Sequence, residues 1–415
     1  MRLSSPSPVA DAIGAGTLAC GFRRLARAAL GAGLAIVPAV APAEEPRPPW
    51  TAELTYSADA LANLRGGIDE GAAWLGRADA TLEIDGRAIG LPGATLFFDI
   101  VYSHGPDFSG RRVGDAQVVS NVQGDGILRP YEAWLSVPIG ADLAVKAGMV
   151  DLNSEFDVQS VGAFFINASH GIGPDFSQSG ANGPSIYPVP TTAAIVKWES
   201  DNGHVKAGLF NARAGDPDHP RKVRIPFPGE DGALIVAEGA ARIGAARAQI
   251  GGWIYTSAEE RIAEPGRRAK GSKGAYGQIE ARLAGRDGDK GDDGDIGDDG
   301  GAALDGWIRI GTADRRTNRI GFYAGGGLTW GDERRRSGFA VAHARQSDRA
   351  ARDFLPEEGP QKRAETSFEI GHARQLADFL SVQPFAQYVV NPGWRADLPD
   401  AVVAGVRLDL AFALR

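Results

Sequence analysis

One segment near the C-terminus, residues 401–412, constrains the fold of this chain more than any other. Alternate residues from Val402 to Phe412 are all apolar, whereas the intervening positions include Arg407 and Asp409. Successive side chains of a β-strand point to opposite faces, so the segment predicts a strand with one apolar and one charged face. Its length and aromatic end are typical of an outer-membrane barrel, in which the apolar face meets lipid and the other meets a water-filled lumen. On this basis Leu408→Arg is expected to disturb folding and Arg407→Leu to be tolerated.

The N-terminal region has the features of a secretory signal peptide. Arg23, Arg24 and Arg27 precede an apolar run over residues 28–40, which ends in Ala-Pro-Ala before Glu44. The run is shorter than the roughly twenty residues that a spanning helix needs. The sequence therefore predicts a signal peptide at residues 1–43 and an outer-membrane porin barrel at residues 44–415. The single cysteine, Cys20, lies in the predicted signal, so no disulfide and no cysteine metal site is expected in the mature chain.

Composition and motifs argue against nucleic-acid binding and against catalysis. The chain has 52 acidic and 44 basic residues, a net charge of −8, which does not favour a nucleic-acid partner. Its six histidines form no metal-binding pair at helical spacing, and no G-x-S-x-G motif is present. We therefore expect no enzymatic activity, no metal and no cofactor.

Short segments of alternating polarity recur along the chain and predict an all-β fold. They indicate a single transmembrane antiparallel β-barrel of about sixteen strands with a polar inner face. The predicted strands are residues 50–58, 77–86, 94–103, 129–137, 141–149, 191–199, 203–210, 232–243, 247–256, 274–284, 305–312, 319–330, 337–345, 365–374, 379–390 and 401–412. An even count places both termini at the periplasmic end and the long connections at the other end. The long connections are residues 151–190, 211–231, 257–273 and 346–364.

One connection on the predicted periplasmic side breaks the expectation of short turns. Residues 285–301 consist almost entirely of glycine and charged residues, mostly aspartate. Such a composition cannot bury apolar area, so we expect a disordered, solvated insertion. A calcium site is the alternative, because clustered carboxylates suit Ca²⁺.

The connection at 151–190 carries the most specific motifs. It contains DLNSEFD (151–157), FFINASHGI (164–172) and PDFSQSGANGPSIYP (174–188). Further motifs are FNARAGDPD (210–218) and QPFAQYVVNPG (383–393). Together these closely resemble the signature regions of the carbohydrate-selective outer-membrane porin family.

The resemblance implies a sixteen-stranded barrel that passes sugars by diffusion, with the 151–190 connection as a long pore-constricting loop. The residues agree, since a connection of this length is seldom without function. Its amide, hydroxyl and carboxylate groups can hydrogen-bond sugar hydroxyls, and its aromatic side chains can stack on sugars or pack against the wall.

The candidate pore-lining and sugar-contacting residues come from this connection and from inward strand positions. They are Glu132, Trp134, Lys146, Asp151, Asn153, Glu155, Asp157, Asp175, Lys206, Glu280, Arg282, Arg309, Gln383, Gln387 and Arg407. Two interpretations stay open for the charged members: they set the ion preference of the pore, or they pair with one another and merely keep the lumen wet.

The sequence thus predicts an outer-membrane porin for passive diffusion of mono- and small oligosaccharides and small ions. Expected partners are permeating carbohydrates, outer-membrane lipid and lipopolysaccharide, and the barrel-assembly machinery, with a homo-oligomer left open. The alternatives are a general or anion-preferring porin, a secreted β-rich binding protein, and a barrel-embedded hydrolase. A serine–histidine pair within hydrogen-bond reach would support the last.

Overall fold

The computed structural model of the protein describes residues 48–124, 126–216, 231–262, 264–285, 301–347 and 361–414. The predicted signal peptide at 1–43 and residues 286–300 of the Gly/Asp insertion lie outside the described residues.

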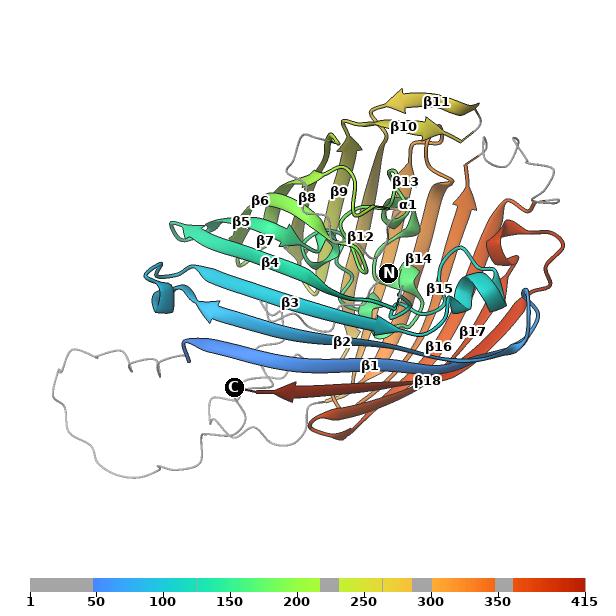
Figure 1. Ribbon diagram of the computed structural model, residues 1–415. Helices are drawn as coiled ribbons and strands as arrows, with labels where there is room; N and C mark the ends of the chain where they lie inside the picture. Colours follow the sequence, from blue (N-terminus) through green and yellow to red (C-terminus); the bar gives the residue numbers. More distant parts are fainter. Residues whose placement is uncertain are drawn as a thin grey trace.

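Sixteen antiparallel strands close into a single barrel (Figure 1). They are β1 (Trp50–Arg65), β2 (Gly71–Asp85), β3 (Thr95–His104), β4 (Leu128–Ile139), β5 (Leu143–Val150), β6 (Thr191–Ser200), β7 (Gly203–Asn211), β8 (Ala233–Ile243), β9 (Ala246–Tyr255), β12 (Lys273–Ala284), β13 (Ala303–Ala313), β14 (Ile320–Gly331), β15 (Arg335–Gln346), β16 (Ala364–Ala377), β17 (Leu380–Val390) and β18 (Ala401–Ala413). Each strand pairs with its neighbours in chain order, and β1 pairs with β18 to close the barrel. The predicted all-β barrel of sixteen strands is confirmed.

Two further strands, β10 (Ala258–Arg261) and β11 (Glu264–Lys270), form a separate hairpin between β9 and β12. The sequence did not predict this hairpin. Its strands carry charged residues at adjacent positions, so they lack the alternation of polarity that reveals a strand with one buried face.

The register of the closing strands places apolar and charged residues on opposite faces as expected. Asp59 lies opposite Arg407, and Ala58 lies opposite Leu408. Arg407 is buried inside the barrel, whereas Val406 and Phe412 are exposed on the outer face. Such exposed apolar rows suit a lipid environment.

The connections 105–127 and 151–190 follow β3 and β5 and therefore leave the sheet at the end of the barrel opposite the two chain ends that the structure describes. The connection predicted at 151–190 contains only short helical segments: η4 (Leu152–Ser154), η5 (Gly162–Phe164), η6 (Ala168–His170) and α1 (Pro174–Ser177). A second long connection, residues 105–127, includes η3 (Ser109–Val113) and was not recognised as special from the sequence. Within the described part of the chain, no helix is long and apolar enough to cross a membrane.

The barrel interior is less polar than the sequence indicated. Phe97, Trp134, Phe210 and Trp253 point inward from the wall formed by β3 to β13 and pack with buried residues of the 151–190 connection. Full burial of each such side chain contributes about 1.5–3 kcal/mol. The expectation of a polar inner face holds only in part for this wall, where aromatic side chains alternate with buried charged ones such as Lys146 and Glu238, and the connection covers both kinds.

Candidate functional site

Two connections fold into the barrel and define the space that remains. We call residues 151–190 the first inner loop and residues 105–127 the second inner loop. The first inner loop turns inward directly after β5, where the Asp151 amide donates to Glu132 Oε1 at 2.9 Å. The Asp151 carboxylate then accepts from the Asn153 amide at 3.0 Å, and Asn153 Nδ2 donates to the carbonyl of Phe156 at 3.2 Å. These bonds satisfy backbone groups that leave the sheet in a buried environment.

Glu155 fixes the next turn of the first inner loop by binding two lysines of the wall. Lys146 Nζ contacts Glu155 Oε1, and Lys206 Nζ lies 3.5 Å from Glu155 Oε2. Lys146 also lies 3.8 Å from the centre of the Trp134 ring, a cation–π geometry. Burial alone would raise the pKa of the Glu155 carboxyl, but the two ammonium groups outweigh it and hold that pKa well below its usual range.

A fully buried arginine holds the centre of the first inner loop against β13. Arg309 Nη2 lies 2.7 Å from Asp157 Oδ2, and Arg309 Nη1 lies 2.6 Å from Asp175 Oδ1. Asp157 adopts a left-handed backbone conformation with φ of 56°, and its amide donates to Glu238 Oε2 at 2.8 Å. The one guanidinium thus binds two points of the loop that are separated by η5 and η6.

Beyond this cluster the first inner loop passes β12 and continues to β16 and β17. The Val161 amide donates to Glu280 Oε1 at 2.8 Å, and Gln383 Nε2 donates to the Phe164 carbonyl at 2.8 Å. The amides of Ile166 and Asn167 both donate to the carboxylate of Glu369, at 2.6 and 2.9 Å. The loop therefore crosses the lumen from β5 to β16 and β17.

The second inner loop meets the first one inside the barrel. The Ala168 amide donates to the Val118 carbonyl at 3.0 Å, and the Asn121 amide donates to the Ile166 carbonyl at 3.0 Å. Val118 has a φ of 60°, a strained conformation for a β-branched residue. Ser120 Oγ donates to Asp59 on β1 at 2.6 Å. The two loops thus form one unit that is tied to both sides of the barrel.

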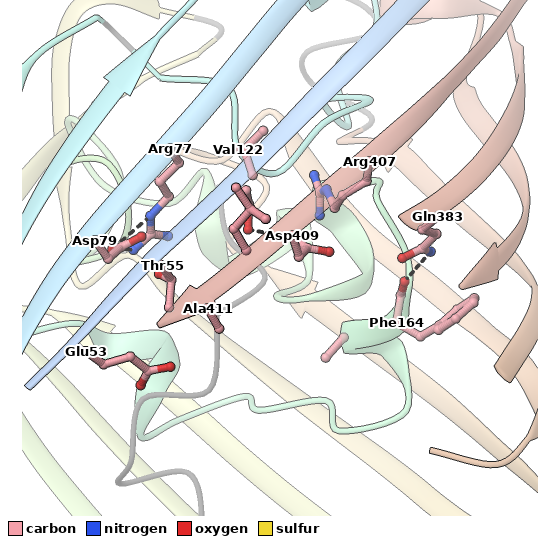
Figure 2. A pocket seen from close by; sticks show the side chains of 13 residues that line it. Glu53, Thr55, Arg77, Asp79, Val122, Phe164, Gln383, Arg407, Asp409 and Ala411 are labelled. Atoms are coloured by element: carbon pink, nitrogen blue, oxygen red, sulfur yellow. Dashed lines mark hydrogen bonds and ion pairs between the residues drawn. The ribbon is translucent and has the colours of Figure 1, made fainter. Parts of the chain in front are cut away.

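A cavity of about 290 Å³ remains between these loops and the wall where the barrel closes. Its lining comes from β1, β2, β17 and β18 and from one edge of each inner loop (Figure 2). The lining residues are Glu53, Thr55, Ser57, Arg77, Asp79, Val122, Ala163, Phe164, Gln383, Arg407, Asp409, Leu410 and Ala411. Most side chains are polar, and Phe164 is the aromatic residue of the lining.

The charged groups of the cavity are held in place by short-range partners. Arg77 pairs with Asp79, and its guanidinium lies 4.4 Å from the centre of the Tyr187 ring. Arg407 binds both oxygens of Asp59 at 2.7 Å. Asp409 accepts from Ser57 Oγ at 2.6 Å. The lining is therefore organised before any solute enters.

The structure divides the predicted site residues into two groups and places Arg282 outside both. Gln383 and Arg407 line the cavity. Twelve others are buried and take part in contacts between the first inner loop and the wall. They are Glu132, Trp134, Lys146, Asp151, Asn153, Glu155, Asp157, Asp175, Lys206, Glu280, Arg309 and Gln387. Gln387 Oε1, for example, accepts from Asn167 Nδ2 of the first inner loop at 3.4 Å. Arg282 pairs at 2.5 Å with Asp305 on the neighbouring strand.

Several residues that line the cavity were not among the site residues predicted from the sequence. Glu53, Thr55 and Ser57 alternate with Leu54 and Tyr56 on β1. That alternation could have identified them as inward-facing. Arg77 and Asp79 follow the same rule on β2. No sequence pattern indicates that the first inner loop covers the wall formed by β3 to β13 and leaves the wall formed by β1, β2, β17 and β18 open.

A serine–histidine pair does occur, on the outer face of the barrel. Ser337 Oγ and His372 Nδ1 lie 2.8 Å apart. Among the residues that the structure describes, no carboxylate or amide bonds the other ring nitrogen of His372, so a third member that would orient the histidine is missing from this pair.

Comparison with known proteins identifies the family. The family model described as carbohydrate-selective porin, OprB family, matches residues 69–412. No curated protein matches the sequence. A solved structure described as the high pH structure of Pseudomonas putida OprB aligns with 88% of this chain and 94% of its own, at 18% identity and a TM-score of 0.75. The low pH structure of the same protein aligns with 88% of this chain and 92% of its own, at 17% identity and a TM-score of 0.55.

A mutant of the Rh. blastica porin aligns with 88% of this chain and 100% of its own, at 10% identity and a TM-score of 0.50. At these identities the structural likeness supports the barrel fold, and the family assignment depends on the sequence model. Because that model covers most of the chain, the protein belongs to the OprB family of carbohydrate-selective porins and is an outer-membrane channel, not an enzyme.

Proposed function

We propose that sugars cross this porin along an off-centre path through the cavity beside β1, β2, β17 and β18. The observation that carries the proposal is the unequal filling of the barrel. The first inner loop packs on the apolar wall around Trp134 and Trp253, whereas the opposite wall presents polar side chains to open space. A water-filled route on that side needs no displacement of buried apolar groups.

The chemistry of the lining suits a neutral polyhydroxylated solute. Carboxylates such as Asp409 accept hydrogen bonds from sugar hydroxyls, and guanidinium groups such as Arg407 donate to them. Phe164 offers an aromatic face for the apolar C–H surface of a pyranose ring. Since these charged groups already have protein partners, a sugar competes for them and binds weakly, as release from a pore requires.

The charge of the lining argues against the anion-preferring alternative. Three carboxylates, Glu53, Asp79 and Asp409, stand against two guanidinium groups, Arg77 and Arg407. The excess of one negative charge favours cations weakly over anions. A reversal potential measured across a KCl gradient tests this directly, since its sign reports which ion passes more easily.

The experiment for the proposed path compares two phenylalanines in planar bilayers. Phe164→Ala removes the aromatic face from the cavity, and we expect higher ion conductance and a higher sugar concentration for half-maximal block. Phe379→Ala is the matched control, because Phe379 lies exposed on the outer face, where it stacks on Phe412. Unchanged sugar block in Phe164→Ala would contradict the proposal.

Export and assembly complete the proposal. We expect cleavage near Ala43, insertion by the barrel-assembly machinery, and contact of the outer apolar rows with lipid and lipopolysaccharide. The exposed apolar side chains Ile250, Ile308 and Ile370 support the lipid contact. N-terminal sequencing of the protein purified from outer membranes is expected to begin at Glu44. The disorder of the Gly/Asp insertion stays a prediction from the sequence, and the sequence leaves the oligomeric state open.

A further inference from the structure

The outer face of β15 and β16 carries a pair of arginines at an unusual place. Arg335 lies directly opposite Arg374 in the register of the two strands. One step further along, Ser337 lies opposite His372, and the next outward pair is Phe339 and Ile370. Since Phe339 and Ile370 are 45% and 57% exposed, this row faces outward, and so do both arginines. Strands β14, β15 and β16 lie side by side in the barrel (Figure 1).

The two arginines stand out from the rest of the barrel end at which they lie. Both are close to the turns 332–334 and 378–379, at the end where the termini lie, which is the periplasmic end by the usual arrangement of such barrels. Along the described strands, the other outward residues near this end are apolar or small; examples are Trp50, Ile84 and Phe412. The positive charge is therefore local and does not form part of a general basic rim.

No carboxylate of the described structure neutralises the pair. Asp332, in the adjacent turn, accepts instead from the backbone amides of Arg334 and Arg335 at 2.8 and 2.7 Å. Within the described residues, neither the Arg335 nor the Arg374 guanidinium has a hydrogen-bond or ion-pair partner in the protein. Like charges directly opposite each other destabilise a sheet, so an external anion at this position would remove an unfavourable interaction.

The surroundings indicate which anion fits. Trp330 lies next to Ser337 in the register, is 46% exposed, and belongs to the aromatic residues that mark the edge of the apolar band. Immediately beyond such an edge lie the phosphate groups of the periplasmic leaflet. Guanidinium groups bind phosphate through paired, charge-assisted hydrogen bonds, and Phe339 and Ile370 offer apolar contact to acyl chains.

The geometry points to a binding site for the phosphate of an anionic membrane phospholipid, formed by Arg335 and Arg374 with His372 beside them. The lipid's acyl chains lie along Phe339 and Ile370. The site lies on the outer face of the barrel and is independent of the sugar path.

Native mass spectrometry of the refolded full-length mature protein tests this site. The probes are phosphatidylglycerol and phosphatidylcholine with the same acyl chains. We expect the wild-type protein to retain phosphatidylglycerol preferentially. The double variant R335Q/R374Q is expected to bind it about 30-fold more weakly, the factor that two surface arginines contribute at an anionic leaflet.

The matched control is R336Q, which removes the same charge from the next residue of β15, on the inward side of the strand. R336Q is expected to keep the wild-type preference. Equal retention of the two lipids by the wild type, equal loss in R336Q, or displacement of the lipid by equimolar inorganic phosphate would overturn the assignment. If the double variant does not assemble, the single variants R335Q and R374Q provide the same comparison, each with about fivefold weaker retention.

Discussion

Arg309 Nη2 lies 2.7 Å from Asp157 Oδ2, and neither side chain has any solvent exposure. The same guanidinium also binds Asp175. Replacing Arg309 with methionine would leave two buried carboxylates without their cation, a loss of about 3–5 kcal/mol in buried pairs. We therefore expect Arg309→Met to release the first inner loop from β13, raise the single-channel conductance and expose residues 151–190 to protease.

The control for Arg309 is Arg282→Gln, because Arg282 pairs with Asp305 on the neighbouring strand and is partly exposed. This variant should keep wild-type conductance and protease resistance. Wild-type conductance in Arg309→Met would show that the buried cluster does not hold the loop.

A second prediction concerns pH. The His170 ring is fully buried between Phe165 and Trp307, with ring centres 5.2 and 5.6 Å away. Burial lowers the pKa of His170 to about 3 from its ordinary value of 6.5. The neutral ring is thus favoured in the folded loop. The contribution of the neutral His170 ring to the stability of the folded loop is complete above pH 6.5. It declines by about 1.4 kcal/mol per pH unit as the pH falls toward 3.

We accordingly expect acid to loosen the first inner loop and to weaken sugar block below about pH 5. His170→Phe keeps an aromatic ring without a titrating group, so its sugar block should stay constant over the same range. An identical acid response in wild type and His170→Phe would exclude His170 as its origin.

A third prediction concerns the ion preference of the cavity. Asp409→Asn removes one negative charge from the lining. A unit charge about 4 Å from an ion is worth about 1 kcal/mol in water, which corresponds to at most about a fivefold change in local cation concentration. The reversal potential in a KCl gradient should shift toward that of chloride. Asp397→Asn, which changes an exposed residue of the connection 391–400, should leave the reversal potential unchanged, and equal shifts in both variants would argue against a local effect.

A fourth prediction separates the two faces of β18. Leu408→Arg places a charge on the outer face and should cost about 2–4 kcal/mol near the membrane midplane. Arg407→Leu was expected from the sequence to be tolerated. The structure changes this expectation, because Arg407 binds the fully buried Asp59. We now expect a loss of about 3–5 kcal/mol, measured by refolding in urea with Leu408→Ala as the control.

Much of the fold was predictable because each barrel strand has its own alternation of apolar and polar residues in the sequence. The alternation around Arg407 and Asp409 predicted both the strand and which of its side chains face the lumen. All sixteen predicted segments correspond to barrel strands. The charged hairpin β10–β11 was missed because its sequence lacks the alternation of apolar and polar residues. The family motifs likewise identified the first inner loop.

The site was less predictable because it depends on contacts between distant segments. Arg309 and Asp157 are 152 residues apart, and no local pattern distinguishes an inward charge that faces water from one that holds a loop. Most of the chosen residues are in such buried contacts. The second inner loop was overlooked because it lacks the dense motifs of the first, although Ser120 and Asn121 are fully buried inside the barrel.

Cysteine accessibility tests the off-centre path most directly. The only native cysteine is Cys20, within the predicted signal peptide, so a single introduced thiol can be studied alone. Thr55→Cys places it in the cavity, whereas Val236→Cys places it on the opposite wall, fully buried under the first inner loop. We predict that a charged, water-soluble thiol reagent modifies Thr55→Cys during conduction and reduces the current, and leaves Val236→Cys unmodified. Rapid modification and block at Val236→Cys, with none at Thr55→Cys, would contradict the account.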